Sequence, residues 1–244
     1  MAWNIEGGRV LRGATLEPGA VGLSEGIIGD ATPGARRFDA SGLLVMPGLV
    51  DIHGDAHERQ MEPRSGIGFT TGLALRDSAA QILAAGITTA YLGVTLSWEP
   101  GLRSIEAWRA LRAELATMPA GPDLRVHLRF EADNLDAVDE ALADMAGGRV
   151  HLLGFNDHTP GMLPKLADDT KMAKYAARAG MSLAQFRTLL ESVVARRVEV
   201  PAARVRMAEA ARAAGVTMLS HDDATLAMRA EFRALGAHIA EFPL

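Results

Sequence analysis

After residue 46 the sequence alternates between short apolar, β-branched segments and longer segments with helical periodicity. Strands are predicted at residues 49–53, 87–94, 124–130, 149–155, 216–220 and 237–241. Helices are predicted between them at 76–85, 104–118, 134–146, 163–179, 183–196, 202–214 and 224–235, with Ser104 and Asn134 as candidate N-caps. Repeated strand–helix units are typical of a parallel β/α architecture, so the chain is predicted to be an α/β protein.

Polar residues follow the predicted strands and distinguish an open sheet from a barrel. They occur directly after four strands, as His53 and Asp55, Glu131, Asn156-Asp157-His158, and His221-Asp222-Asp223. Sites of (β/α)8 barrels are built from such strand ends, whereas a doubly wound sheet concentrates its signal in a glycine-rich first turn. The sequence Gly66-Ile67-Gly68 does not match that turn. We therefore predict a TIM barrel of which about six of eight strands are present.

The first 46 residues are rich in glycine and lack helical periodicity. Short apolar runs between Gly, Pro and Ser are typical of β-structure with tight turns. We predict two domains, a small β-sandwich portion at residues 1–46 and the partial barrel at 47–244.

Charge and composition narrow the classes of partner. The chain has 25 Lys and Arg against 30 Asp and Glu, so the sequence predicts no nucleic-acid partner. It has no apolar run of about 20 residues and no signal-peptide pattern at its start, which predicts no membrane contact and a cytoplasmic location. It also has no Cys. Any bound metal must therefore be held by imidazole and carboxylate.

Three of the seven histidines, His53, His158 and His221, follow predicted strands and stand beside carboxylates. In an extended segment His53 and Asp55 would lie on one face, and Glu131 could bridge two ions. A single His or Glu at a strand end is usually only hydrogen-bonded or solvated, but the coincidence at four ends favours a divalent metal, zinc or manganese. His57 stays open between ligand and loop residue. Three further histidines are assigned structural roles: His127, His151 and His238.

Several strings resemble the amidohydrolase superfamily, whose opening motif PG-x-x-D-x-H is matched by VMPGLVDIH at 45–53. More specific are HGDAHER at 53–59, LRFE at 128–131, DHTPG at 157–161, SHDDAT at 220–225 and AEFP at 240–243. Together they resemble the PhnM-type enzymes of carbon–phosphorus lyase pathways, which are α-D-ribose 1-methylphosphonate 5-triphosphate diphosphatases. The resemblance implies a barrel of the metallo-dependent hydrolase type. It also implies a hydrolase of phosphonate metabolism that uses water to release pyrophosphate from a ribose 5-triphosphate.

The resemblance also implies roles for individual residues. A pair of divalent ions, zinc first and manganese as the alternative, would be held by His53, Asp55, Glu131, His158 and His221. Asp222 and Asp223 would orient His221 or contact the ribose hydroxyls. The substrate, a phosphorylated sugar phosphonate, would need cationic contacts. Their candidates are Arg59, Arg64, Arg129 and Lys165, although Arg64 and Lys165 are equally well explained as solvated surface charges.

Length is the main departure from the resemblance. A complete barrel needs about 250 residues, and here 46 residues precede it in a chain of 244. We expect strands seven and eight, and the Asp that ends strand eight in the superfamily, to be missing. Two alternatives stay open: another amidohydrolase acting on a cyclic amide or N-acyl group, and a truncated, inactive metal-binding fragment. Exposed edge strands ending at His53 and Glu241 predict self-association, for example as a homo-oligomer.

Overall fold

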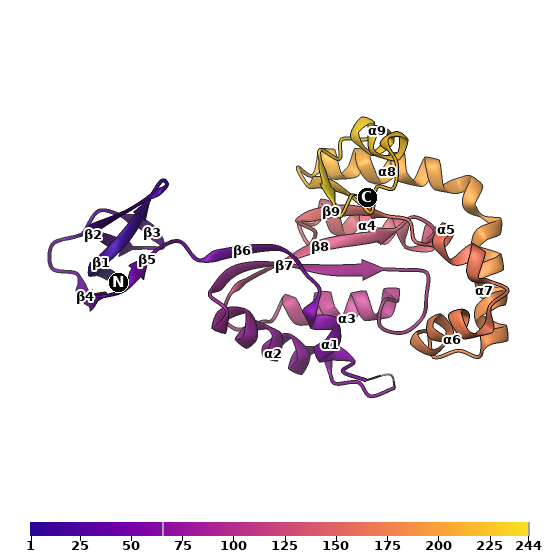
Figure 1. The fold of residues 1–244 in the computed structure, drawn as a ribbon, viewed down its shortest axis with the longest axis horizontal. Coiled ribbons are helices and arrows are strands. Elements are labelled where there is room, and N and C mark those ends of the chain that lie inside the picture. The colour runs from indigo at the N-terminus through magenta and orange to yellow at the C-terminus, as the bar shows by residue number, and fades with distance from the viewer. Residues whose placement is uncertain (65, 244) are drawn as a thin grey trace. The chain divides into compact units, whose positions relative to one another are not determined.

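The computed structural model describes residues 1–64 and 66–243, which form two compact units. The first unit is Met1–Leu49 and the second begins at Val50, three residues later than the predicted boundary. Each unit has its own sheet (Figure 1). Among the described residues, no helix combines the length and the apolar character that a membrane crossing requires.

The N-terminal unit is a small sheet built around β1 (Ala2–Arg12). β2 (Thr15–Ser24) pairs with it antiparallel, and β3 (Ile27–Gly29) pairs antiparallel with β2. β4 (Arg36–Asp39) and β5 (Leu44–Val45) both run parallel to β1. The described residues form one sheet rather than two packed layers, and only Val10 and Ala40 of its apolar side chains are buried. The predicted small β unit is therefore confirmed.

The second unit contains a six-stranded sheet in the order β11-β10-β9-β8-β7-β6. Its strands follow one another in sequence order, and the pairs from β7 to β11 are parallel. This confirms the predicted partial (β/α) barrel, with β6 and β11 as its edge strands. The strands are β6 (Leu49–Gly54), β7 (Ile87–Leu96), β8 (Asp123–Glu131), β9 (Leu152–Asn156), β10 (Thr217–His221) and β11 (Ile239–Glu241).

Helices connect the strands and pack against the sheet (Figure 1). Ser104 caps its helix as predicted, accepting a hydrogen bond from the Ala107 amide at 3.2 Å. Asn134 makes no side-chain cap, because a 3-10 turn at Leu135–Ala137 comes before the helix. The helices are α1 (Ala56–Met61), α2 (Thr71–Ala84), α3 (Ile105–Leu115), α4 (Val138–Ala146), α5 (Thr159–Met162), α6 (Asp169–Arg178), α7 (Leu183–Ala195), α8 (Val200–Ala213) and α9 (Leu226–Ala234).

The single helix predicted at 163–179 is wrong. The chain instead forms the short α5, a 3-10 turn at Leu163–Lys165, and then α6. Pro164 lacks an amide proton and cannot continue an α-helical ladder. Asp168 then caps α6 by accepting a hydrogen bond from the Lys171 amide at 3.1 Å.

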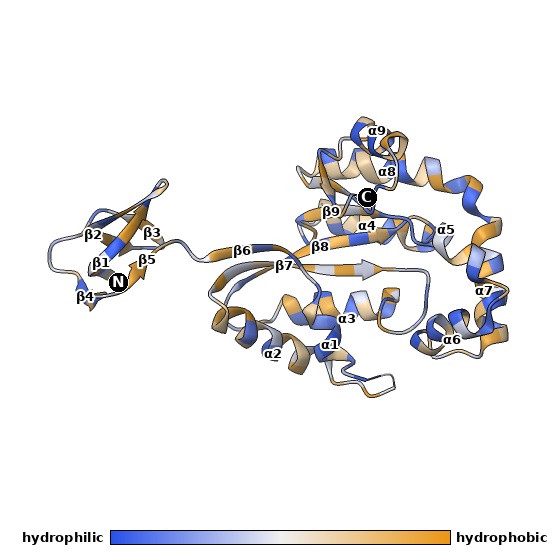
Figure 2. Ribbon diagram, in the orientation of Figure 1, coloured by the Kyte–Doolittle hydropathy of each residue, from blue (hydrophilic) through white to orange (hydrophobic). Residues whose placement is uncertain are grey.

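Two apolar clusters stabilise the second unit. The larger lies between the sheet and the helices and includes Leu92, Leu128, Trp108 and Met145, all at most 1% exposed. The smaller joins α5, α6 and α7 through Met172, Phe186 and Leu190. Figure 2 shows mixed hydropathy along the helices around the sheet, as expected for elements that are buried on one side only. The helical segment α5–α7 therefore has its own small core beside the sheet.

Candidate metal centre

The two edge strands of the six-stranded sheet meet through their side chains. His53 Nδ1 on β6 lies 3.1 Å from Glu241 Oε2 on β11. Five strand spacings of about 4.8 Å would separate these edges by about 24 Å in a flat sheet. The sheet must therefore curl strongly, as a partial barrel does. The curl brings inward side chains from the carboxyl ends of different strands into one place.

One group of potential metal ligands consists of His53, His221 and Glu241, whose donor atoms lie within 4.8 Å of one another. Glu241 is 8% exposed. Burial opposes its ionisation, but the His53 hydrogen bond and the neighbouring imidazoles outweigh burial and lower the pKa of Glu241. His127 Nε2 lies 3.7 Å from the same carboxylate, and burial lowers the pKa of His127 to about 4. Glu241 is thus an anion among imidazoles.

A second group consists of His158, His221 and Asp222. Asp222 Oδ2 lies 2.9 Å from His221 Nδ1 and 3.4 Å from His158 Nε2. On the other side of the ring, His158 Nδ1 lies 2.5 Å from Glu131 Oε1, and this hydrogen bond raises the pKa of His158. The carboxylate therefore fixes the ring so that Nε2 faces Asp222. Because His221 belongs to both groups, the two positions are adjacent.

The side chains at this end of the sheet fit a divalent cation. Imidazole and carboxylate donors without sulfur suit zinc or manganese. Several buried polar atoms here have no hydrogen-bond partner among the described residues, although such atoms usually have one. They include His127 Nε2, Arg129 Nε and Asn156 Oδ1. A polar ligand or ion would compensate part of this cost.

Asp55 lies outside both groups, and the expected extended geometry from His53 to Asp55 is wrong. β6 ends at Gly54, and Asp55 is the N-cap position of α1, with an exposed side chain. Leaving the strand breaks the two-residue alternation that would have placed both side chains on one face. His57 lies on α1 and is 3% exposed, so it is a buried helical residue rather than a loop residue.

The four expected cationic residues have different positions. Arg129 is 8% exposed and its Nη2 lies 3.2 Å from His221 Nε2, so it lies in the centre. Lys165 lines a cavity beside Glu131 and His158. Arg59 and Arg64 are exposed, on α1 and in the turn after it. Neither residue lines that cavity or the cavity next to it. The structure therefore brings two of the four to the site.

Asp222 and Asp223 are adjacent but differently placed. Asp222 has a left-handed backbone, with φ of 55°, and its side chain lies between His158 and His221. Asp223 is 3% exposed, and its Oδ2 accepts a hydrogen bond from Ser220 Oγ at 2.5 Å. Asp222 can thus contact an ion or orient both imidazoles. Asp223 supports the turn after β10.

Sequence reasoning missed Glu241, His127 and the Arg103–Glu58 pair. Glu241 is the last residue of its strand, so selecting polar residues at strand ends, which identified Glu131, would also have identified Glu241. His127 looked structural, yet the curl brings it to Glu241. Arg103 donates to Glu58 at 3.0 and 2.8 Å, and no local pattern predicts contact between residues 45 positions apart.

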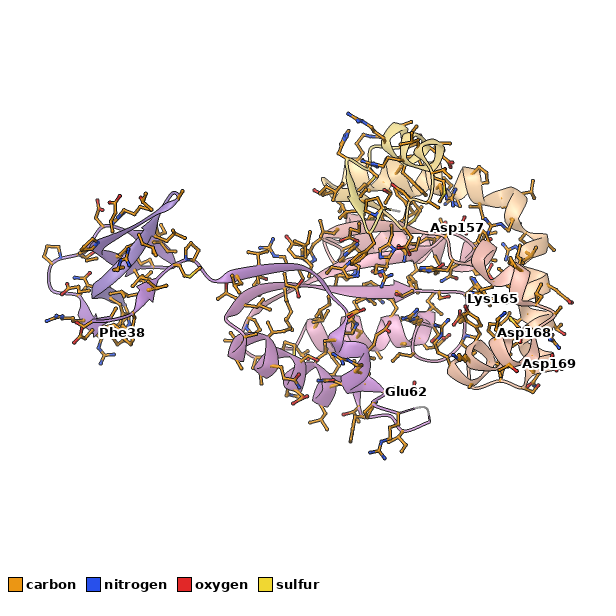
Figure 3. All side chains as sticks on the ribbon, viewed as in Figure 1. Phe38, Glu62, Asp157, Lys165, Asp168 and Asp169 are labelled. Atoms are coloured by element: carbon orange, nitrogen blue, oxygen red, sulfur yellow. The ribbon has the colours of Figure 1, made fainter. Side chains whose placement is uncertain are left out.

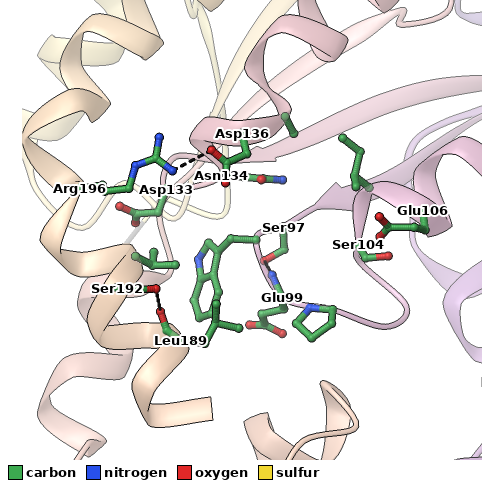
Figure 4. Close-up of a pocket in the computed structure, with 15 residues that line it drawn as sticks. Ser97, Glu99, Ser104, Glu106, Asp133, Asn134, Asp136, Leu189, Ser192 and Arg196 are labelled. Carbon is green, nitrogen blue, oxygen red and sulfur yellow. Dashed lines mark hydrogen bonds and ion pairs between the residues drawn. The ribbon is translucent and has the colours of Figure 1, made fainter. Parts of the chain in front are cut away.

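One cavity lies beside the centre, and a second cavity shares Ser97 and Glu99 with its wall. The first, of about 360 Å³, extends from Glu131 and His158 to α5 and α6. Figure 3 shows Lys165 in this helical part, near Asp168. The second, of about 450 Å³, lies between the turns after β7 and β8 and helix α7 (Figure 4). The centre thus has room for an organic substrate next to it.

Comparison with known proteins confirms the resemblance found in the sequence. Over 215 residues the chain is 28% identical to the protein of Escherichia coli (strain K12) named Alpha-D-ribose 1-methylphosphonate 5-triphosphate diphosphatase. The match covers 85% of this chain and 57% of that protein, so the chain spans little more than half of its relative's length. No protein-family profile matches the chain.

One solved structure supports the fold at low sequence identity. The crystal structure of an uncharacterized protein aligns with a TM-score of 0.54 and 15% identity, covering 98% of this chain and 60% of that one. A D-hydantoinase structure aligns with a TM-score of 0.47 and 18% identity, covering 98% and 57%. The first of these matches supports the fold alone.

Proposed function

We propose that the chain carries the metal centre of a hydrolase that cleaves a phosphoric anhydride with water. The observation that carries the proposal is the convergence of His53, His158, His221, Asp222 and Glu241 at the carboxyl ends of the curled sheet. The sequence relationship to a diphosphatase supports the choice of phosphoric anhydride as the bond that is cleaved.

Two divalent cations fit the two groups. His53, His221 and Glu241 would hold one ion, and His158 and Asp222 would hold another beside it. When bound, such ions activate water and offset the charge of phosphoryl oxygens. Glu131 would then orient His158 through the Nδ1 hydrogen bond, as carboxylates commonly do for metal-binding histidines. Zinc and manganese both suit this donor set.

Arg129 is positioned to contact the substrate. Arg129 brings a buried cation to the centre, and its Nε has no partner among the described residues. A guanidinium is suited to phosphoryl oxygens because its N–H groups form a planar fork. We therefore assign Arg129 to substrate contact.

The proposed substrate is a ribose 5-triphosphate that carries a 1-methylphosphonate, as in the name of the Escherichia coli relative. Hydrolysis would release pyrophosphate and leave a 5-phosphate, within phosphonate catabolism by the carbon–phosphorus lyase route. We place the protein in the cytoplasm as part of the same proposal.

Metal content and hydrolysis test the proposal together. The purified chain is loaded with zinc or manganese, desalted and analysed by elemental mass spectrometry, and pyrophosphate release from the sugar triphosphate is followed. We expect about two ions per chain and metal-dependent pyrophosphate release. Release of ammonia or opening of a cyclic amide instead would contradict the choice of bond. A chain that retains no metal would contradict the centre itself.

The matched variants are His221→Ala and His238→Ala. His221 belongs to both ligand groups, whereas His238 is exposed and belongs to neither. Metal retention should fall in the first variant and stay unchanged in the second. Equal loss in both variants would show that the metal binds to surface histidines.

A further inference from the structure

The cavity beside Glu131 and His158 has walls from two different parts of the second unit. One wall is the end of β7 and the turn after it, with Thr95, Ser97 and Glu99. The opposite wall is the helical segment, with Lys165, Tyr175 and Arg178. Any group bound in this cavity would lie next to the metal centre.

Three cations line the cavity, and two of them are already paired. Arg103 binds Glu58 at 3.0 and 2.8 Å. Arg178 binds the buried Glu99 through contacts of 2.6 to 2.9 Å. Each of these positive charges is therefore matched by a carboxylate and is less available to an anion.

Lys165 is different. Its Nζ donates to the Tyr175 hydroxyl at 3.0 Å and lies 5.6 Å from the centre of that ring. Within the described part of the chain, no carboxylate pairs with it. Tyr175 itself stacks on Phe186, with ring centres 6.2 Å apart, so the lysine is held against a rigid aromatic surface. The cavity therefore contains one held but unneutralised ammonium group.

Thr95 provides a second, independent observation. It is 4% exposed, lines the cavity, and its hydroxyl has no hydrogen-bond partner among the described residues. A buried hydroxyl without a partner is unfavourable unless a ligand supplies one. A phosphoryl oxygen is a strong acceptor for such a donor.

The neighbouring cavity is more acidic. Its walls include Glu99, Glu106, Asp133 and Asp136, and its only cation among the described lining residues, Arg196, binds Asp136 at 2.7 Å (Figure 4). An anion would be repelled there. The first cavity holds three cations against the three carboxylates of Glu99, Glu131 and Asp157, whereas the second holds one cation against four carboxylates among the described lining residues.

We propose that Thr95 and Lys165 form an anion subsite that binds a phosphoryl group of the substrate beside the metal centre. Tyr175 positions Lys165 in this arrangement. The inference rests on the proposed function for the identity of the anion, but the subsite itself is defined by the cavity, the unpaired ammonium and the unpaired hydroxyl. It would favour phosphorylated substrates over neutral amides.

Inorganic pyrophosphate is a suitable probe, with binding measured by calorimetry on the full chain, both metal-loaded and after chelation. We expect Lys165→Gln to weaken binding about 10-fold or more, because a charged hydrogen bond is lost. Thr95→Val should weaken it about 3- to 10-fold. The matched control is Lys174→Gln, an exposed lysine on α6, which should change binding less than about 2-fold.

Three outcomes are informative. Wild-type affinity in Lys165→Gln and Thr95→Val, or an equal loss in Lys174→Gln, would overturn the subsite. Lysine-dependent pyrophosphate binding without any hydrolysis would support the subsite while the proposed function fails. Thr95→Val also reports on folding, because a methyl group in place of an unpaired hydroxyl should not lower the melting temperature. In the hydrolysis assay, Lys165→Gln should raise KM more than it lowers kcat.

Discussion

Two buried polar clusters of the second unit differ in how completely their hydrogen bonds are satisfied. Asp144 on α4 is fully buried, and its carboxylate accepts from Trp108 Nε1 at 2.7 Å, Arg112 Nη1 at 2.5 and 2.6 Å, and Arg149 Nε at 2.6 Å. At the candidate metal centre, by contrast, His127, Arg129 and Asn156 each keep a buried polar atom without a partner among the described residues.

The difference separates stabilising polar groups from functional ones. The buried atoms without partners belong to residues that lie between the middle of the strands and the turns after them, or on α1 directly after β6. The Asp144 cluster joins α3, α4 and the loop before β9 and contributes to stability alone. A buried network whose polar atoms are all hydrogen-bonded needs no ligand. A network with unpaired polar atoms is completed when a ligand supplies the missing hydrogen bonds.

The largest effect on stability is expected at the Asp144 cluster, in which every hydrogen bond of the carboxylate is satisfied. Asp144→Ala should lower the free energy of unfolding by about 3–5 kcal/mol, because two guanidinium groups and an indole N–H lose their buried acceptor. Chemical denaturation measures this loss, and metal affinity of the folded fraction should not change. The control is Asp139→Ala, which removes an exposed ion pair with Arg206 and should cost less than about 1 kcal/mol. Similar losses in both variants would contradict the comparison.

The cluster at the candidate metal centre should show the opposite pattern, with a large loss of metal affinity and little loss of stability. His221→Ala should weaken metal binding about 100-fold or more, since the residue belongs to both ligand groups, while the metal-free stability changes little. Competition with a chromogenic chelator measures the affinity, and thermal denaturation after chelation measures the stability. A large loss of metal-free stability would mean that His221 is a structural residue like Asp144.

Glu241→Gln separates the two ligand groups. The substitution removes a charge from the group with His53 and leaves His158 and Asp222 intact, so the metal stoichiometry should fall from about two ions to about one. Elemental analysis after dialysis gives the stoichiometry. Glu231→Gln, which affects a surface pair with Arg204, is the matched control. Retention of both ions would show that Glu241 is no ligand.

The smallest effect is expected at a satisfied but exposed carboxylate, Asp168. Hydrogen bonds from the Lys171 side chain and amide lower the pKa of Asp168, so folding favours its ionised form. Its contribution to stability is therefore present above pH of about 3.8 and is lost as the pH falls through the lowered pKa. Acid titration followed by circular dichroism should show a shallower decline for Asp168→Asn. An unchanged decline of the signal with pH would mean that the Asp168 cap does not contribute to stability.

Local sequence patterns predicted much of the second unit. The alternation of strands and helices was confirmed for the six-stranded sheet, and boundaries shifted by a few residues. Errors arose where local chemistry competes with periodicity. Pro164 and the Asp168 cap split one predicted helix, and the early start of α1 moved Asp55 out of the extended segment.

By itself, the sequence determined the strand order and the placement of His53, His158 and His221 at strand ends, because periodicity and turn chemistry depend on neighbours within a few residues. Tertiary structure alone decided that Glu241 meets His53, 188 positions away, and that Arg178 is neutralised by Glu99, 79 positions away. These contacts depend on how strongly the sheet curls and where α6 docks. The same packing left Lys165 without a carboxylate partner among the described residues.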